Sequence, residues 1–179
     1  ECAVAPDRLR GAGQTALRTI DEGIADRAAI ADAGLRGVMR PGEPGTLVDG
    51  GPDYADPAWD PFWEAAVDHG LPLSFHILTS KSSAFNGTPR GSRLNGFLGI
   101  IRGIQDIMGT LVFGGVFERH PRLNVVCVEA DAGWVPHYMY RMDHAYHRHR
   151  NWMAPGVELS KPPSVYFAEH IYVTFQDDW

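Results

Sequence analysis

Two side chains that can bind a metal ion or transfer protons stand at the ends of two apolar runs. His76 closes the run at residues 71–76, and Glu129 directly follows Val-Val-Cys-Val at residues 125–128. A carboxylate at the edge of an apolar layer needs a cation, hydrogen-bond donors or a proton, because an unpaired charge there costs several kcal/mol. An imidazole and a carboxylate at adjacent strand ends suit zinc, manganese or iron. We therefore expect His76 and Glu129 to share one pocket, but two ligands alone do not make a metal site; the alternative for His76 is a hydrogen-bonded structural role.

A second set of polar side chains lies on the helix expected after residue 133. Four basic residues fall on one face of it, at i, i+4, i+7 and i+11: His137, Arg141, His144 and Arg148. We interpret His137 and Arg141, with Arg40 at the end of an earlier strand, as binding an anionic substrate; the alternative is a solvated or interdomain face. The His147-x-His149 pair is not a metal pair, because two helical steps turn these side chains about 200° apart.

The elements that must position these residues alternate along the chain. Five short apolar runs are typical of strands, at residues 8–14, 35–39, 71–77, 123–128 and 171–175. The helical segments between them are expected at residues 15–33, 60–69, 97–119 (broken near Gly109 or Gly114-Gly115), 134–150 and 164–169. Strands separated by helices, with no hairpin signal, favour parallel βα units. Open doubly wound sheets and closed barrels share this pattern, but no Gly-x-Gly-x-x-Gly follows any strand, which favours the barrel.

Local signals mark the helix ends and one long loop. Thr15 is expected to cap the first helix, and Asp60 the second with Pro61 in its first turn. The polar segment at residues 79–95 is long for a connection in a compact domain. We expect that segment to be mobile and to cover the mouth of the pocket.

Composition limits the class of protein. The 179 residues are 44% hydrophobic and 21% charged, as in a globular protein with one domain. The longest apolar stretches contain glycine and fall far short of the roughly 20 residues of a membrane span. The formal charge is −6 without a basic block, so neither a membrane nor nucleic acid is an expected partner. Cys2 and Cys127 lie far apart, and Cys127 is expected to be a buried thiol in a cytoplasmic protein.

Several motifs together resemble the amidohydrolase 2 family. They are Asp60-Pro-Phe-Trp-Glu-Ala-Ala-Val, Gly70-Leu-Pro-Leu-Ser-Phe-His76, Phe113-Gly-Gly-Val-Phe-Glu-Arg-His-Pro-Arg-Leu123, Glu129-Ala-Asp-Ala-Gly-Trp-Val-Pro136, Arg141-Met-Asp143 and Pro163-Ser-Val-Tyr-Phe167. That family contains metal-dependent hydrolases and nonoxidative decarboxylases on a distorted (β/α)8 TIM barrel. The resemblance implies that residues 1–179 form one incomplete barrel domain, since such barrels take about 250 residues and only five strands are predicted here.

The resemblance also implies roles for the two central residues. His76 matches the histidine that closes the fifth strand and binds the metal. Glu129 stands where decarboxylase-like members carry a histidine for acid–base chemistry, and a carboxylate there can act as ligand or base but not as an imidazolium. The resemblance implies that the family's first strand supplies a His-x-His or Glu-x-His pair and its last strand an aspartate, both outside residues 6–178. Asp177 and Asp178 are not taken for that aspartate, because they follow Thr-Phe-Gln, which in the family precedes it by a few dozen residues.

Three functional hypotheses follow from these residues. The first is a hydrolase that acts on a small organic substrate through water activated by a divalent metal, zinc in the first instance, with iron or manganese as alternatives. The second is a nonoxidative decarboxylase of an aromatic or enoic acid. The third is a barrel scaffold without catalysis, which stoichiometric metal would argue against. We expect a small-molecule substrate and a homo-oligomer in each enzymatic case.

Overall fold

The computed structural model describes residues 2–76, 91–154 and 157–176. Five parallel strands form one sheet in the order of the sequence: β1 (Ala12–Gln14), β2 (Gly37–Arg40), β3 (Leu73–His76), β4 (Val125–Val128) and β5 (Ile171–Val173). The principal helices are α1 (Ile20–Asp32), α2 (Asp60–Asp68), α4 (Arg93–Phe113), α5 (Val116–Arg119), α6 (Val135–Met153) and α7 (Pro163–His170). Short 3₁₀ turns occur at η1 (Cys2–Val4), η2 (Gly45–Asp49) and η3 (Pro57–Trp59).

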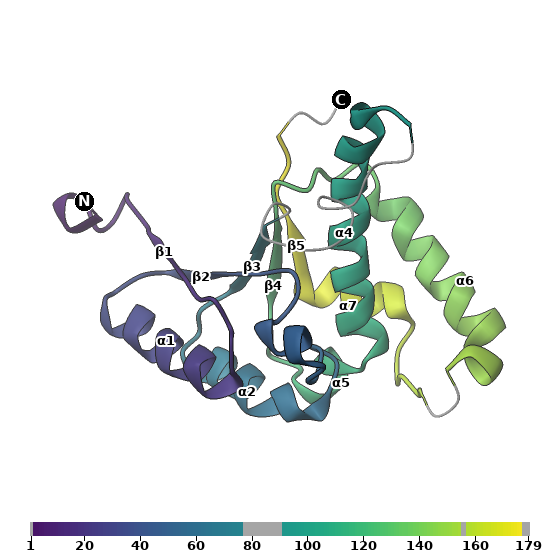
Figure 1. Ribbon diagram of the computed structural model, residues 1–179, viewed down its shortest axis with the longest axis horizontal. Helices are drawn as coiled ribbons and strands as arrows, with labels where there is room; N and C mark the ends of the chain where they lie inside the picture. The colour runs from purple at the N-terminus through teal and green to yellow at the C-terminus, as the bar shows by residue number, and fades with distance from the viewer. Residues whose placement is uncertain (1, 77–90, 155–156, 177–179) are drawn as a thin grey trace.

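Within the described residues the sheet is open, which confirms the prediction of five parallel strands that do not close a barrel. Right-handed connections between neighbouring parallel strands place every helix on the same side of the sheet (Figure 1). The other side corresponds to the interior of a barrel. We call the side covered by helices the helix face and the opposite side the site face.

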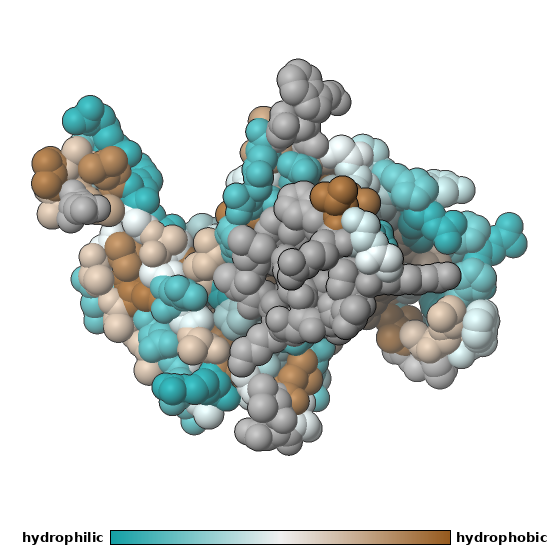
Figure 2. Space-filling model, turned by 45° about the horizontal axis from the view of Figure 1, so that its top comes forward, coloured by the Kyte–Doolittle hydropathy of each residue, from teal (hydrophilic) through white to brown (hydrophobic). Residues whose placement is uncertain are grey.

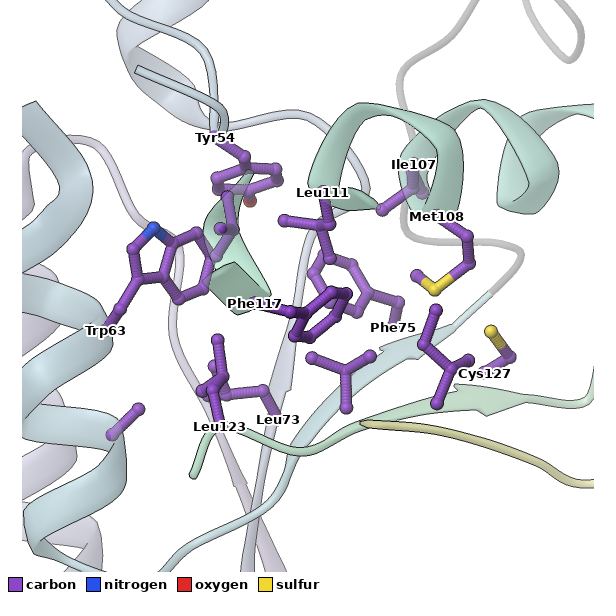
Figure 3. Close-up of a cluster of buried hydrophobic side chains, with 14 of the residues drawn as sticks. Tyr54, Trp63, Leu73, Phe75, Ile107, Met108, Leu111, Phe117, Leu123 and Cys127 are labelled. Atoms are coloured by element: carbon purple, nitrogen blue, oxygen red, sulfur yellow. The ribbon is translucent and has the colours of Figure 1, made fainter. Parts of the chain in front are cut away.

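The core lies between the helix face and the helices. Val38, Leu73, Phe75, Val125 and Cys127 point into it from alternate strand positions and have relative exposures of 0%. Figure 3 shows Leu73, Phe75 and Cys127 facing α4 and α5 side chains such as Met108, Leu111 and Phe117. The prediction that Cys127 is a buried thiol is confirmed, and neither Cys127 nor Cys2 forms a disulfide.

Two predicted helix caps are wrong by a few residues. The Thr15 hydroxyl donates to Asp26 Oδ2 at 2.6 Å, and α1 begins after Thr19, whose hydroxyl accepts from the N–H of Glu22 at 3.1 Å. Leu17, between them, is fully buried with φ of 47°, so packing delays the start of the helix. Asp60 lies inside the first turn of α2, because the 3₁₀ turn η3, capped by the Asp56 side chain, runs directly into that helix.

The long helical segment breaks where one of the two predicted sites lies. α4 continues through Gly109 and ends at Phe113; Gly115 then adopts φ of 68° before α5 begins. Gly114 is required by a close approach, since an added Cβ would lie 2.4 Å from the Cβ of Ala55. The loop predicted to be mobile falls mainly on residues 77–90, outside the described residues, and residues 93–95 already belong to α4.

One described helix is long and apolar enough to cross a membrane by length and composition alone. Residues 94–113 of α4 have a mean hydropathy of 1.3, and 38% of the apolar window is buried in the molecule. Ile104, Met108 and Leu111 of α4 pack into the core. Core helices reach the same hydropathy, so the predicted absence of a membrane span stays a prediction.

Candidate active site at the carboxyl ends of β3 and β4

The imidazole of His76 and the carboxylate of Glu129 are in direct contact. Nε2 of His76 lies 2.5 Å from Oε2 of Glu129, and their side chains are 22% and 40% exposed. His76 is the last residue of β3, and Glu129 follows the last residue of β4. The prediction that these two side chains meet at one edge of the sheet is confirmed.

Strand register explains why His76 reaches the site face. His76 pairs with Val128 and is half-buried, whereas its neighbour Phe75 pairs with Cys127 and is fully buried on the helix face. Side chains along a strand alternate between the two faces of a sheet. His76 therefore points to the barrel interior, where parallel α/β barrels place their catalytic groups at the carboxyl ends of the strands.

Arg40 lies on the other face, which corrects its assignment to substrate binding. Arg40 pairs with Phe75 in the register of β2 and β3, so both side chains enter the core, and Arg40 is 0% exposed. A residue can close a strand and still point away from the site, because one step along a strand reverses the direction of the side chain.

The guanidinium of Arg40 is packed among aromatic rings. Its Cζ lies 4.3 Å from the ring centre of Tyr54, 4.6 Å from that of Trp63 and 4.5 Å from that of Phe75. Burial lowers the pKa of Arg40, and Tyr54 partly opposes that shift. Cation–π contacts at this distance stabilise a desolvated guanidinium. Arg40 is therefore a core residue that joins β2, α2 and the loop at Tyr54.

The predicted basic face of α6 is exposed at its first two positions. His137 and Arg141 both have exposed side chains, and the α6 side of the molecule, at the right of Figure 2, is largely hydrophilic. This exposure suits substrate binding and a solvated face equally, so the role of His137 and Arg141 stays a prediction.

The two histidines of the His147-x-His149 pair have different neighbours. His149 packs against His144 at 5.8 Å between ring centres, whereas His147 packs against Tyr146.

Two further residues shape the site, and the interpretation of the sequence missed both. Thr174 follows β5, and its hydroxyl accepts from the N–H of Glu129 at 2.8 Å. The Asp131 carboxylate accepts from the N–H of Gln176 at 3.2 Å. The only signal for Thr174 is its place at the carboxyl end of a strand, since a threonine in a β-branched strand is otherwise unremarkable.

The donor atoms present fit part of a divalent metal site. The imidazole nitrogen of His76 and the carboxylate oxygens of Glu129 are ligand types shared by zinc, manganese and iron sites. Among residues 2–76, 91–154 and 157–176, however, no group of three or more His, Cys, Asp or Glu side chains is placed to hold a metal ion. Asp177 and Asp178 lie outside the described residues. The ligand roles of His76 and Glu129 stay predictions.

The whole chain matches a known family. A family profile described as amidohydrolase matches residues 1–179. The chain belongs to the amidohydrolase family. Its similarity to solved structures extends to an amidohydrolase from Mycobacterium avium subsp. paratuberculosis K-10, with 21% identity and a TM-score of 0.73 over 92% of this chain and 42% of that one. The open sheet is thus an incomplete TIM barrel of this family.

Two other similar structures are decarboxylases with bound manganese. The 5-carboxyvanillate decarboxylase from Novosphingobium aromaticivorans, complexed with manganese and 4-hydroxy-3-methoxy-5-nitrobenzoic acid, is 21% identical with a TM-score of 0.77, covering 97% of this chain and 49% of that one. A dihydroxybenzoic acid decarboxylase from Polaromonas sp. JS666, with manganese and 2-nitroresorcinol, is 18% identical with a TM-score of 0.70, covering 97% and 52%. The chain spans about half the length of the solved structures it matches.

Proposed function

We propose that this chain supplies part of the active site of a metal-dependent nonoxidative decarboxylase that acts on a small aromatic carboxylic acid. The observation that carries the proposal is the contact between His76 Nε2 and Glu129 Oε2 at the carboxyl ends of two adjacent parallel strands. The similarity of the fold to decarboxylases supports this reaction over hydrolysis, which was the first hypothesis from the sequence. The same similarity favours manganese over zinc as the metal to test.

The chemistry assigns a distinct task to each residue. His76 and Glu129 would hold a divalent metal from one side, and the bound metal would supply positive charge that orients the substrate carboxylate. The other task open to Glu129 is acid catalysis: free of the metal and protonated, it would deliver a proton to the ring carbon that bears the carboxylate. The bond from that carbon to the carboxylate then breaks, its electron pair returns to the ring, and carbon dioxide leaves. In the metal-free protein, His76 holds Glu129 in place through the contact between Nε2 and Oε2.

Hydrolysis remains a second candidate for a specific reason. Glu129 stands where decarboxylase-like members are expected to carry a histidine, and a carboxylate is a good acceptor for a proton from water. In that case Glu129 would act as a general base and take a proton from the water that attacks an amide, lactone or thioester. A barrel scaffold without catalysis is the third candidate, and it needs no metal.

One experiment separates these candidates. The full-length protein is loaded with Mn²⁺ or Zn²⁺ and incubated with 5-carboxyvanillate, dihydroxybenzoates and a panel of amides, lactones and thioesters. Release of carbon dioxide that depends on Mn²⁺ and is lost in His76→Ala would support the decarboxylase. Hydrolysis without carbon dioxide release would favour the second candidate. Absence of stoichiometric metal and of both activities would reject an enzyme.

We further propose that the protein resides in the cytoplasm and forms a homo-oligomer.

A further inference from the structure

Glu129 points to the site only because the strand ends irregularly. In β4, Val125 and Cys127 are fully buried on the helix face, and Val128 pairs with His76 on the site face. If the extended strand continued, Glu129 would turn toward the buried helix face, as Cys127 does. Instead, Glu129 adopts a left-handed conformation with φ of 61°, and its carboxylate contacts His76 on the site face.

The hydrogen bonds between β4 and β5 show where the extra turn is inserted. The N–H of Thr174 donates to the carbonyl of Cys127 at 2.9 Å, as in a regular parallel ladder. The next ladder bond to the carbonyl of Thr174 should come from Glu129, but it comes from Ala130 at 3.2 Å. Glu129 is thus one residue in excess, as in a β-bulge, and bulges redirect side chains near active sites.

Thr174 satisfies the backbone group that this irregularity leaves without a ladder partner. The Thr174 hydroxyl accepts from the N–H of Glu129 at 2.8 Å and lies 3.5 Å from the carbonyl of Cys127. A non-glycine residue with positive φ is unfavourable, so it persists only where its surroundings hold it. The neighbouring residues are tied as well: Nε1 of Trp134 donates to the carbonyl of Ala130 at 2.7 Å.

We propose that Thr174 is a positioning residue that directs the Glu129 carboxylate to His76 by holding Glu129 in its left-handed conformation through the hydroxyl. The inference rests on the proposed function in one respect: the pair of His76 and Glu129 that Thr174 helps to form is proposed to bind the metal. Its geometric part rests on the positive φ of Glu129 and on the hydrogen bond from the Glu129 N–H to the Thr174 hydroxyl. Thr174 does not contact the reacting groups; it acts through Glu129.

The test compares three variants of the full-length protein. Thr174→Val keeps the shape of the side chain and removes the hydroxyl, whereas Thr174→Ser keeps the hydroxyl. Thr46→Val is the matched control, because it removes a hydroxyl that donates to the carbonyl of Pro52 at 2.7 Å in a different loop. Amide hydrogen exchange of Glu129 is measured in metal-free protein, and Mn²⁺ affinity by calorimetry.

We expect Thr174→Val to raise the exchange rate of the Glu129 amide at least tenfold and to weaken Mn²⁺ binding about tenfold or more, the range for residues that orient metal ligands. Thr174→Ser should stay within about twofold of wild type in both measurements, the margin separating it from that tenfold effect. Thr46→Val should lower the unfolding temperature and leave both unchanged. If Thr174→Val does not fold, Thr174→Ala replaces it with the same expectations.

Two results would overturn the inference: unchanged exchange and Mn²⁺ affinity in Thr174→Val, or equal losses in Thr174→Ser. Weakened Mn²⁺ binding in Thr46→Val would also overturn it, because the effect would then be general destabilisation. The two proposals can also be told apart. If the wild-type protein binds no Mn²⁺, the proposed function is rejected. If Thr174→Val still raises the exchange rate of the Glu129 amide in that case, the positioning role of Thr174 is supported.

Discussion

At the scale of single residues, the half-exposed contact between His76 and Glu129 is the feature of the chain that bears most on chemistry. The carboxylate is 40% exposed and the imidazole 22%, so both are reachable from the site face. Each group can carry or accept a proton, and both are of residue types that bind metal ions in proteins. Substitutions that keep shape and change charge therefore separate the possible roles.

Glu129→Gln keeps the size of the side chain and removes its charge and its proton. We expect turnover to fall by about 10²–10⁴-fold, the usual contribution of a general acid or base. Retained Mn²⁺ in this variant would support acid–base chemistry, and loss of metal together with activity would support a ligand role. Near-normal turnover with full metal content would remove Glu129 from the site.

Arg40→Lys tests the correction made for Arg40. A lysine keeps the positive charge but cannot stack its headgroup among Tyr54, Trp63 and Phe75 as a planar guanidinium does. We expect a loss of unfolding free energy of about 1–3 kcal/mol, measured by urea denaturation, with KM and Mn²⁺ affinity unchanged. A raised KM at wild-type stability would restore the substrate-binding interpretation.

At the scale of elements, one carboxylate joins α2 to the segment at α5. Asp60 accepts from Nε of Arg119 at 3.0 Å and contacts Nε2 of His120 at 2.9 Å. Arg119 also donates to the carbonyls of Gly114 and Ala55 at 2.7 and 3.1 Å. This cluster ties the helix layer together at positions where the backbone turns sharply.

Asp60→Asn should destabilise the protein by about 1–3 kcal/mol, because it leaves charged and buried donors with a weaker acceptor. Asp68→Asn on the same helix is the control. Asp68 lies 3.9 Å from Arg122, and both side chains are about three-quarters exposed, so its loss should change the unfolding free energy by less than about 0.5 kcal/mol. Equal effects in urea denaturation would contradict this distinction.

Tyr138 connects α6 to α4, and its phenol makes the stability of the protein depend on pH. Its hydroxyl donates to the carbonyl of Gln105 at 2.5 Å. Burial, with a smaller effect of Asp106, raises the pKa of Tyr138 from 10.0 to about 12. Between pH 10 and 12 the unfolded phenol loses its proton while the folded one retains it, so this contribution to stability is complete below pH 10 and is lost as the pH rises toward 12.

Tyr138→Phe should therefore cost about 1 kcal/mol at pH 8 through the lost hydrogen bond. The difference in unfolding free energy between wild type and variant should shrink as the pH rises from 10 to 12. Tyr140→Phe on the same helix, where the side chain is 64% exposed, should leave the unfolding free energy at pH 8 nearly unchanged. A difference that stays constant or grows across this range would contradict the assigned shift.

At the scale of the whole molecule, the site face of the open sheet is incompletely covered. Met39, Val126 and Val128 are only half-buried, and Tyr172, which pairs with Val126, is 59% exposed. The edge strands β1 and β5 also present backbone groups that can pair with another chain. On the helix face, by contrast, Leu73, Phe75 and Cys127 are fully buried against side chains of α4 and α5 (Figure 3).

Residues 1–179 expressed on their own should consequently self-associate. Light scattering coupled to size-exclusion chromatography is expected to give a mass above that of a monomer. Tyr172→Lys, which places a charge on the site face, should shift the distribution toward monomer. If the unsubstituted chain is a monodisperse monomer, the exposed site face and the edge strands do not drive self-association.

The amino-acid sequence determined the elements and the two central residues. Apolar runs bounded by glycine and proline give the five strands, and the residue that closes an apolar run lies at a strand end, which locates His76 and Glu129. These signals are local, because hydrophobic periodicity and turn residues act over a few positions.

Only the tertiary structure decided where the side chains at the strand ends point. Arg40 and His76 both close strands, yet one enters the core and the other the site, since register and the pleat set the face. Glu129 reaches His76 through a left-handed turn held by Thr174, which lies 45 residues away in the chain. A hydrogen bond between distant segments leaves no periodic trace in either segment, and a single inserted residue reverses the face on which a side chain lies.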